Sequence, residues 1–249
     1  MKAESAPAPL DPPQPALPAV ILAAGLGSRL GGAGGGAPKA LAPVLGRPLL
    51  AYTLEALAQA GVHQAYVVLG YRGAEIEAAL AGLGPGGPSL HVVWNPDYRL
   101  PNGSSLAAAR AAVAQAPFLL LMADHLLSVE AIRRMLGAEQ RFAIGVDRGP
   151  LPASRLTDAT RVRLRPDGLV AAFGKRLRRW DGIDTGIFRC HPDVFAVIDE
   201  LGVDSELSAI MTRVAARQPF HAVDLSGAFW LDVDTPADLR EAESLLRHG

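Results

Sequence analysis

The sequence predicts an α/β protein in which a mostly parallel central sheet is covered by helices on both faces. Two observations lead to this fold class. Short apolar runs that suit buried strands alternate along the chain with segments whose apolar residues recur at helical spacing. The chain also has 249 residues and 49% hydrophobic content, which is enough to bury a large core. In sheets of this kind ligands bind beyond the carboxyl ends of the strands, so functional residues are expected there.

The first half of the chain shows this alternation most clearly. An apolar run at 20–22 ends in small residues and glycines. A helical pattern follows, with Pro48 in its first turn and Gly61 as its C-terminal cap. The other elements expected here are strands at 65–69, 90–94, 118–122 and 141–146 and helices at 75–80, 106–116 and 128–136.

The pattern changes after residue 148. Two runs at 160–164 and 169–173 flank Arg165-Pro166-Asp167-Gly168, which predicts a β-hairpin. We expect a small β-rich lobe at about 149–235 that lies on a first lobe at about 19–148, within a single domain over residues 19–249. Thr235 is placed to cap a final helix at 236–247, and the Pro- and Ala-rich residues 1–18 are expected to form a disordered tail.

Composition excludes several classes of protein. The formal net charge of −1 gives no reason to expect nucleic acid or an anionic membrane as a partner. No apolar run approaches the length of a membrane helix, so we expect no stable membrane insertion, and the tail lacks the apolar core of a signal peptide. Cys190 is the one cysteine, so no intramolecular disulfide can form, which fits a cytoplasmic protein.

Lysine is rare in this chain. Of 24 basic residues only Lys2, Lys39 and Lys175 are lysines. An ammonium group is smaller than a guanidinium group and can sit between two phosphates, which is a physical reason to keep lysine where a reacting anion is touched. The alternative explanation is that lysine occurs at these positions by chance.

The glycine-rich segment after the first strand predicts a phosphate-binding loop. It reads Leu22-Ala23-Ala24-Gly25-Leu26-Gly27-Ser28-Arg29-Leu30-Gly31 and is followed by Pro38-Lys39. Small residues let a ligand approach the backbone N–H groups, Arg29 can contact phosphate in a bidentate manner, and Lys39 adds a point charge. It is not a P-loop, because that motif requires Gly-x-x-x-x-Gly-Lys-Ser/Thr and no such string occurs. It is not a dinucleotide fingerprint either, because that motif would require glycine at positions 25, 27 and 30, and position 30 is Leu. The expected nucleotide-binding residues of this segment are Leu22, Ala23, Ala24, Gly25, Gly27, Ser28, Arg29 and Lys39.

This loop and its Pro-Lys pair resemble the signature of the nucleotidyltransferases, also called nucleoside-diphosphate-sugar pyrophosphorylases. The resemblance runs from Ala19 to about Leu246 and implies a Rossmann-like fold of the GT-A nucleotidyltransferase type. Within the family, the order of the later motifs is similar to the inositol-1-phosphate cytidylyltransferases. In many of these a membrane-embedded transferase follows, and we expect no such segment within this chain. The later motifs are Asp124-His125, Asp147-Arg148, Arg161 to Leu164, Asp167-Gly168, Gly174-Lys175, Asp184-Thr185-Gly186, Trp230 and Asp232-Val233-Asp234-Thr235-Pro236.

Two further sites are expected on the nucleotide side. Gly103 and Ser104 stand before a predicted helix, where N-capping is the simple explanation, and the resemblance implies contact with the base and ribose as well. Asp124 ends an apolar strand, and burying a carboxylate without a partner costs several kcal/mol, so a divalent cation is expected beside it. Mg²⁺ needs only one or two protein carboxylates, and a neutral imidazole suits it poorly, so His125 is interpreted as shaping the site.

The second lobe is expected to hold the other substrate. The resemblance implies that Lys175 binds the phosphate of an acceptor and that Asp184, Thr185 and Gly186 contact its hydroxyls. Asp232 and Asp234 alternate along an extended segment and therefore point to one side. The resemblance places a second metal-binding acid in this string, and which of the two binds the metal stays open.

Together these residues suit Mg²⁺-dependent transfer of a nucleotidyl group. CTP and inositol 1-phosphate are expected to give CDP-inositol and pyrophosphate, with Arg29, Lys39 and Lys175 as the catalytic cations. Other nucleoside triphosphates, and phosphocholine or sugar 1-phosphates as acceptors, remain alternatives. A non-catalytic nucleotide-binding regulatory subunit is the alternative of another class, whereas the missing fingerprint argues against an oxidoreductase. A homodimer is compatible with the sequence.

Overall fold

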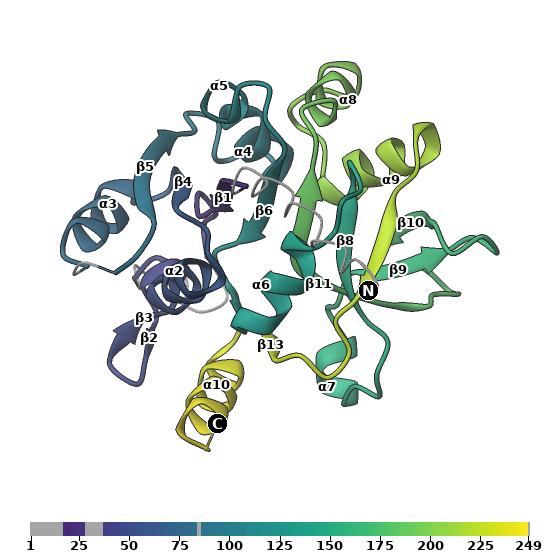
Figure 1. The fold of residues 1–249 in the computed structure, drawn as a ribbon. Coiled ribbons are helices and arrows are strands. Elements are labelled where there is room, and N and C mark those ends of the chain that lie inside the picture. Colours follow the sequence, from purple (N-terminus) through teal and green to yellow (C-terminus); the bar gives the residue numbers. More distant parts are fainter. Residues whose placement is uncertain (1–16, 28–36, 84–85, 249) are drawn as a thin grey trace, which may run out of the picture.

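The structure, a computed structural model, describes residues 17–27, 37–83 and 86–248 (Figure 1). Four parallel strands form its first half: β1 (Ala19–Leu22) lies between β4 (Gln64–Leu69) and β6 (Phe118–Met122), and β5 (Ser89–Trp94) pairs with β4. Within the described ranges no helix is long and apolar enough to cross a membrane.

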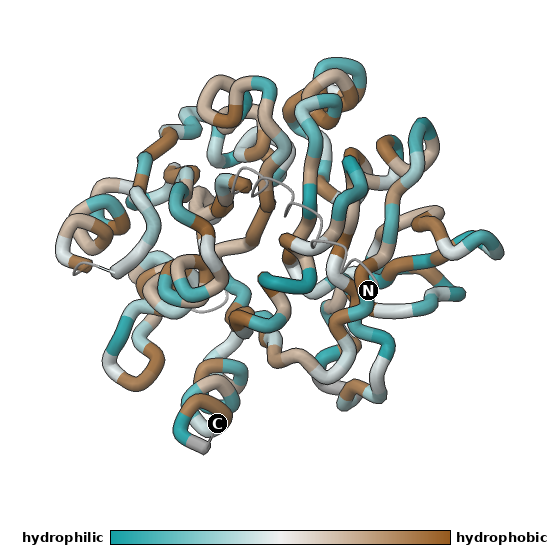
Figure 2. Tube along the Cα trace, viewed as in Figure 1, coloured by the Kyte–Doolittle hydropathy of each residue, from teal (hydrophilic) through white to brown (hydrophobic). Residues whose placement is uncertain are grey.

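Helices cover both faces of this sheet because its central strands are apolar on both sides. In β1, Ala19 and Ile21 pack into one core, while Val20 and Leu22 pack into a second core on the other face. Figure 2 shows the hydrophobic colour concentrated along the central strands. The first core is covered by α2 (Leu49–Ala60), α3 (Gly73–Ala81) and α6 (Val129–Leu136), and the second by α4 (Asn102–Ala108), α5 (Arg110–Val113), α8 (Val194–Leu201) and α9 (Leu207–Arg217).

The second half of the chain extends the same sheet with antiparallel strands. The long strand β11 (Gly182–Cys190) pairs with β6 and also with β8 (Ala143–Asp147) and β9 (Arg161–Leu164). β9 forms the predicted hairpin with β10 (Val170–Gly174), and β12 (His221–Asp224) runs parallel to β8. The predicted fold class is therefore confirmed, and the exact lobe boundaries stay a prediction.

Short elements bring distant segments to the carboxyl end of β6. There β7 (His125–Leu127) pairs with β13 (Trp230–Asp232), which places Asp232 opposite His125. Thr235 caps α10 (Pro236–His248) as predicted: its hydroxyl accepts from the Asp238 N–H at 3.3 Å, and Asp238 Oδ2 accepts from the Thr235 N–H at 2.7 Å. The remaining elements are the 3₁₀ helix η1 (Lys39–Leu41), β2 (Pro43–Val44), β3 (Arg47–Pro48) and α7 (Ala153–Leu156).

The helix predicted at 106–116 differs from the structure. It begins earlier, at Asn102, and is divided into α4 and α5, the second of which ends at Val113. Gly103 and Ser104 consequently lie inside the first turn, and no side chain caps α4. Pro101 precedes this helix, and because proline lacks an N–H and favours a helix start, the helix can begin before the serines.

Candidate functional site

The phosphate loop begins where β1 ends and is held by the neighbouring strands. The Leu22 carbonyl accepts from the Ala123 N–H at 3.1 Å, and the Ala23 N–H donates to Val68 O at 2.9 Å. Ala23 therefore has no N–H left for a phosphate. A Cβ on Gly27, whose φ is +59°, would lie 3.0 Å from Lys39 Cβ, so the loop passes directly against Lys39. Ser28 and Arg29 lie outside the described residues.

Three acidic side chains surround the ammonium group of Lys39. Its Nζ lies 2.6 Å from Asp124 Oδ2 and 3.7 Å from Asp232 Oδ1, and it forms an ion pair with Asp234. Asp124 follows β6, whereas Asp232 ends β13, and the Val233 N–H donates to Asp124 O at 2.9 Å. The structure thus brings Lys39 together with Asp124, Asp232 and Asp234, the three predicted metal-binding acids, and their binding of a metal stays a prediction.

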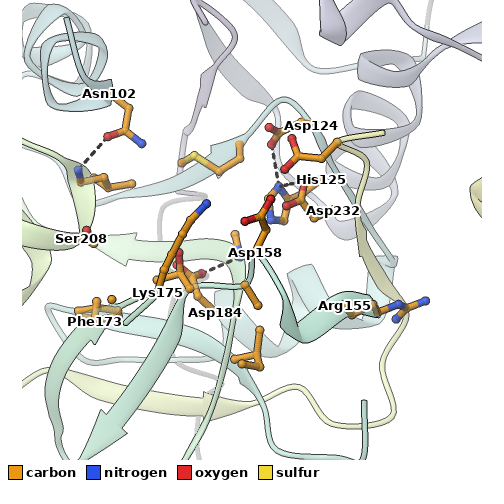
Figure 3. A pocket seen from close by; sticks show the side chains of 18 of the residues that line it. Asn102, Asp124, His125, Arg155, Asp158, Phe173, Lys175, Asp184, Ser208 and Asp232 are labelled. Carbon is orange, nitrogen blue, oxygen red and sulfur yellow. Dashed lines mark hydrogen bonds and ion pairs between the residues drawn. The ribbon is translucent and has the colours of Figure 1, made fainter. Parts of the chain in front are cut away.

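His125 lies beside Asp124 and Asp232 in this cluster (Figure 3). Its Nδ1 lies 2.7 Å from Asp124 Oδ1, and its ring stacks on Trp230 with the ring centroids 6.5 Å apart and the planes 13° apart. Gly186 has a φ of +78°, and a Cβ there would lie 2.3 Å from His125 Cδ2. Glycine at 186 therefore leaves room for the imidazole.

The pKa values follow from burial and from the pairing of opposite charges. Burial would raise the pKa of Asp124, but His125 and Lys39 hold it well below its ordinary value. Burial would lower the pKa of His125, but Asp232 and Asp124 raise it to about 9. In Lys39 the carboxylates of Asp124 and Asp232 likewise outweigh burial and raise the pKa. Lys39, His125 and the surrounding acids therefore form a compact group of interacting charges.

This cluster has the composition of a metal site. One ligand atom each of Asp124, His125 and Asp232 lies within 4.8 Å of the others. Asp232 Oδ1 is buried without a hydrogen-bond partner, and burial raises the pKa of this carboxyl group. A cation can satisfy a buried oxygen of this kind, and the position of Lys39 among the three carboxylates shows that they attract positive charge. Carboxylate oxygens suit a divalent cation, so the residues present fit one.

A cavity of about 1090 Å³ opens beside the cluster and reaches into the second half of the chain. Lys175, directly after β10, and Asp184, on β11, line it together with Asp124 and Asp232. Figure 3 shows Lys175 pointing into the same space as Asp158 and Asp232. Lys175 is exposed and forms no ion pair with any residue that the structure describes. Burial raises the pKa of Asp184 to about 6.

Some of the expected ligand contacts are not evident in this arrangement. Thr185 is fully buried and its hydroxyl donates to Gly145 O at 2.9 Å, so it is turned away from the cavity. Ser104 is also buried, and its hydroxyl is held by Asp97 O and Pro101 O. A Cβ on Gly103 would lie 2.3 Å from Ser205 O, because α4 packs closely there. Contacts of Gly103 and Ser104 with a nucleotide stay a prediction.

Sequence reasoning missed two residues of the cavity wall. Asp158 and Ser208 line the cavity from loop and helix positions that carry no motif. Asp147 belongs to the motif order that carries the resemblance, but the sequence analysis gives it no role in the site. In the structure Asp147 accepts a hydrogen bond from Trp230 Nε1 at 2.8 Å. Asp147 lies at the end of an apolar strand, which is the same sequence signal that identified Asp124.

The fold and the site together define a nucleotidyltransferase. Residues 19–180 match the family described as the MobA-like NTP transferase domain, and the chain belongs to this family. The family predicted from the phosphate loop is thereby confirmed.

Individual relatives share most of this chain. A Rubrobacter xylanophilus protein named bifunctional IPC transferase and DIPP synthase is 39% identical over 92% of this chain and 51% of the relative. A Streptomyces rubellomurinus protein named CMP-5'-(3-aminopropyl)phosphonate synthase is 31% identical over 90% of this chain and 38% of the relative. This chain therefore spans about half of the first of these relatives and less than half of the second.

A solved structure agrees with this assignment. The inositol-1-phosphate CTP transferase from T. maritima superposes with a TM-score of 0.79 at 25% identity, over 94% of this chain and 97% of that chain. UDP-glucose pyrophosphorylase from Acinetobacter baumannii has a TM-score of 0.78 at 18% identity, which shows the same fold.

Proposed function

We propose that this chain transfers the cytidylyl group of CTP to inositol 1-phosphate and releases CDP-inositol and pyrophosphate. The observation that carries the proposal is one cavity that Lys175 lines together with Asp124, Asp232 and Asp234, the acids that surround Lys39. Lys39 lies among three acids beside the phosphate loop, and Lys175 projects toward them without an ion pair to any described residue. The name of the solved T. maritima relative, inositol-1-phosphate CTP transferase, supports CTP and inositol 1-phosphate as the substrates.

The reaction needs charge neutralisation and positioning rather than a covalent enzyme intermediate. A phosphate oxygen of the acceptor forms a bond to the α-phosphorus of CTP, and the bond between that phosphorus and the bridging oxygen breaks as pyrophosphate leaves. The nucleophile is already an anion, so no side chain has to remove a proton. Lys39 and Arg29 would neutralise the departing pyrophosphate, while Lys175 would hold the acceptor phosphate against the repulsion between two anions.

The acidic cluster would hold Mg²⁺. Asp124 and one or both of Asp232 and Asp234 would supply its carboxylate oxygens, and a cation bound there would neutralise charge on the α-phosphate. Asp184 would accept hydrogen bonds from acceptor hydroxyls in the cavity. We expect the reaction to take place in the cytoplasm, and the free, buried Cys190 is compatible with that location. A homodimer is also compatible with the proposed reaction.

One assay tests this proposal against its alternatives. The protein is incubated with Mg²⁺, each common nucleoside triphosphate and a panel of inositol 1-phosphate, phosphocholine and hexose 1-phosphates, and pyrophosphate is measured. We expect release with CTP and inositol 1-phosphate. Release only with another acceptor would overturn the inositol assignment, and no release with any pair would favour a non-catalytic nucleotide-binding subunit.

A further inference from the structure

Asp147 is a buried acid that the proposed reaction does not use. It stands at the carboxyl end of β8 with 7% of its surface exposed. Its Oδ1 accepts from the Gly149 N–H at 2.7 Å, and its Oδ2 accepts from Trp230 Nε1 at 2.8 Å. A carboxylate is costly to bury, so its retention beneath the site calls for a specific role.

Trp230 is held at its edge and on one face. Its indole N–H is fixed by Asp147, while its ring lies nearly parallel to the imidazole of His125. The side chain is 5% exposed, and its strand β13 is paired with β7, on which His125 stands. The hydrogen bond that the indole N–H donates to Asp147 therefore sets the rotation of the indole, and the indole sets the plane of the imidazole.

His125 is confined on other sides as well. Gly186 stands against the imidazole at a distance that no Cβ could occupy, and the Thr53 hydroxyl donates to the backbone oxygen of His125 at 3.1 Å. Held in this way, the ring directs Nδ1 at Asp124 Oδ1. The other carboxylate oxygen, Oδ2, then faces Lys39. One oxygen of Asp124 is used for orientation, and the other is presented to the cluster.

From this chain of contacts we infer that Asp147 is a positioning residue, which acts through Trp230 and His125 to orient the Asp124 carboxylate toward its cation. The groups that orient a metal ligand typically change metal affinity or activity by about 10-fold to 100-fold when removed. The part of this inference that concerns turnover rests on the proposed function, whereas the orientation of His125 and the binding of metal do not.

Three variants test the inference: Asp147→Ala, Trp230→Phe and the double variant. Trp230→Phe keeps an aromatic ring on His125 but removes the indole N–H, so it breaks the same bond even if Asp147→Ala fails to fold. Ser128→Ala serves as the matched control, because it removes only the Ser128 hydroxyl, which caps α6 by accepting from the Ala131 N–H and forms no hydrogen bond with Asp147, Trp230 or His125.

The first readout needs neither substrate nor metal. The imidazole ¹H–¹⁵N resonances of His125 in the metal-free protein should shift in Asp147→Ala and Trp230→Phe and stay in place in Ser128→Ala. Binding of Mg²⁺, measured by calorimetry, should weaken by about 10-fold in both single variants and by no more in the double variant, because both remove one bond.

The kinetic readout separates positioning from general instability. We expect kcat to fall at subsaturating Mg²⁺ while the KM for the acceptor stays unchanged, because Lys175, the residue proposed to bind the acceptor phosphate, forms no ion pair with any residue that the structure describes. Unchanged His125 resonances and metal affinity in both variants would overturn the inference, as would losses that add fully in the double variant. If the wild-type protein shows no turnover with any substrate pair, the proposed function fails, and the resonances and metal affinity still decide the role of Asp147.

Discussion

The two internal lysines of this chain lie in opposite electrostatic environments. Lys39 is 12% exposed and paired with carboxylates on several sides, whereas Lys175 is exposed and makes no ion pair with any described residue. The proposed nucleotide side thus holds most of its charged groups in ion pairs before substrate binds. The proposed acceptor side instead keeps one positive charge available, for which a phosphorylated acceptor would supply the anion.

The largest effect is expected for a substitution at Asp124, among the ion-paired residues around Lys39. Asp124→Ala should lower kcat by about 1000-fold, because a metal ligand at the reacting phosphate contributes several kcal/mol of charge stabilisation. The measurement is steady-state pyrophosphate release, with circular dichroism as the check on folding. Activity within tenfold of wild type would show that Asp124 does not serve the reacting centre.

A smaller and more selective effect is expected at Lys175. Lys175→Ala should raise the KM for the acceptor by about 10-fold to 100-fold, which corresponds to the loss of one charge-assisted hydrogen bond. Binding of CTP, measured by calorimetry, should be unchanged. An equal loss of CTP affinity would contradict the assignment of Lys175 to the acceptor.

The two lysines should also differ in their effect on stability. In metal-free protein Lys39→Met should lower the free energy of unfolding by about 1–3 kcal/mol, because the acids around Lys39 lose their cation. These acids are partly exposed, so solvent screening makes the effect smaller than for a fully buried ion pair. Lys175→Met should change it by no more than about 0.5 kcal/mol. Denaturant unfolding of the two matched variants makes this comparison, and equal shifts would remove the contrast.

The smallest effect concerns pH on the acceptor side. Burial raises the pKa of Asp184 from 3.8 to about 6, so the folded protein binds more protons than the unfolded protein in this interval. Stability from this group is present below its unfolded pKa and is lost as pH rises through about 6. Asp184→Asn should therefore gain thermal stability relative to wild type between pH 4 and about 6, and a constant difference across that range would contradict this account.

Local patterns predicted the parallel half of the fold and its hairpin. The runs of β1 and β6 are apolar on both faces, and that signal does not depend on distant residues. The helix at 106–116 was placed too late because Pro101 permits an earlier start, which outweighed the capping preference of the serines. The environment of Thr185 could not be foreseen, since its partner Gly145 lies 40 residues away.

The site shows the same division between local and distant information. An acid at the end of a buried strand identified Asp124, and the alternation of Asp232 and Asp234 placed both near one side. That Lys39 would lie between them depends on pairs separated by 85 and 195 residues. Asp147 carries the same local signal as Asp124, but its partner Trp230 is known only from the tertiary structure.

The central claim is that an acceptor phosphate is joined to the α-phosphorus of CTP in this cavity. The most direct measurement is ³¹P NMR of the protein mixed with Mg²⁺, CTP and inositol 1-phosphate. We predict two mutually coupled diphosphate resonances of CDP-inositol, appearing in equal amount with pyrophosphate. Formation of CMP and pyrophosphate without a coupled diphosphate product, or an unchanged spectrum, would contradict the claim.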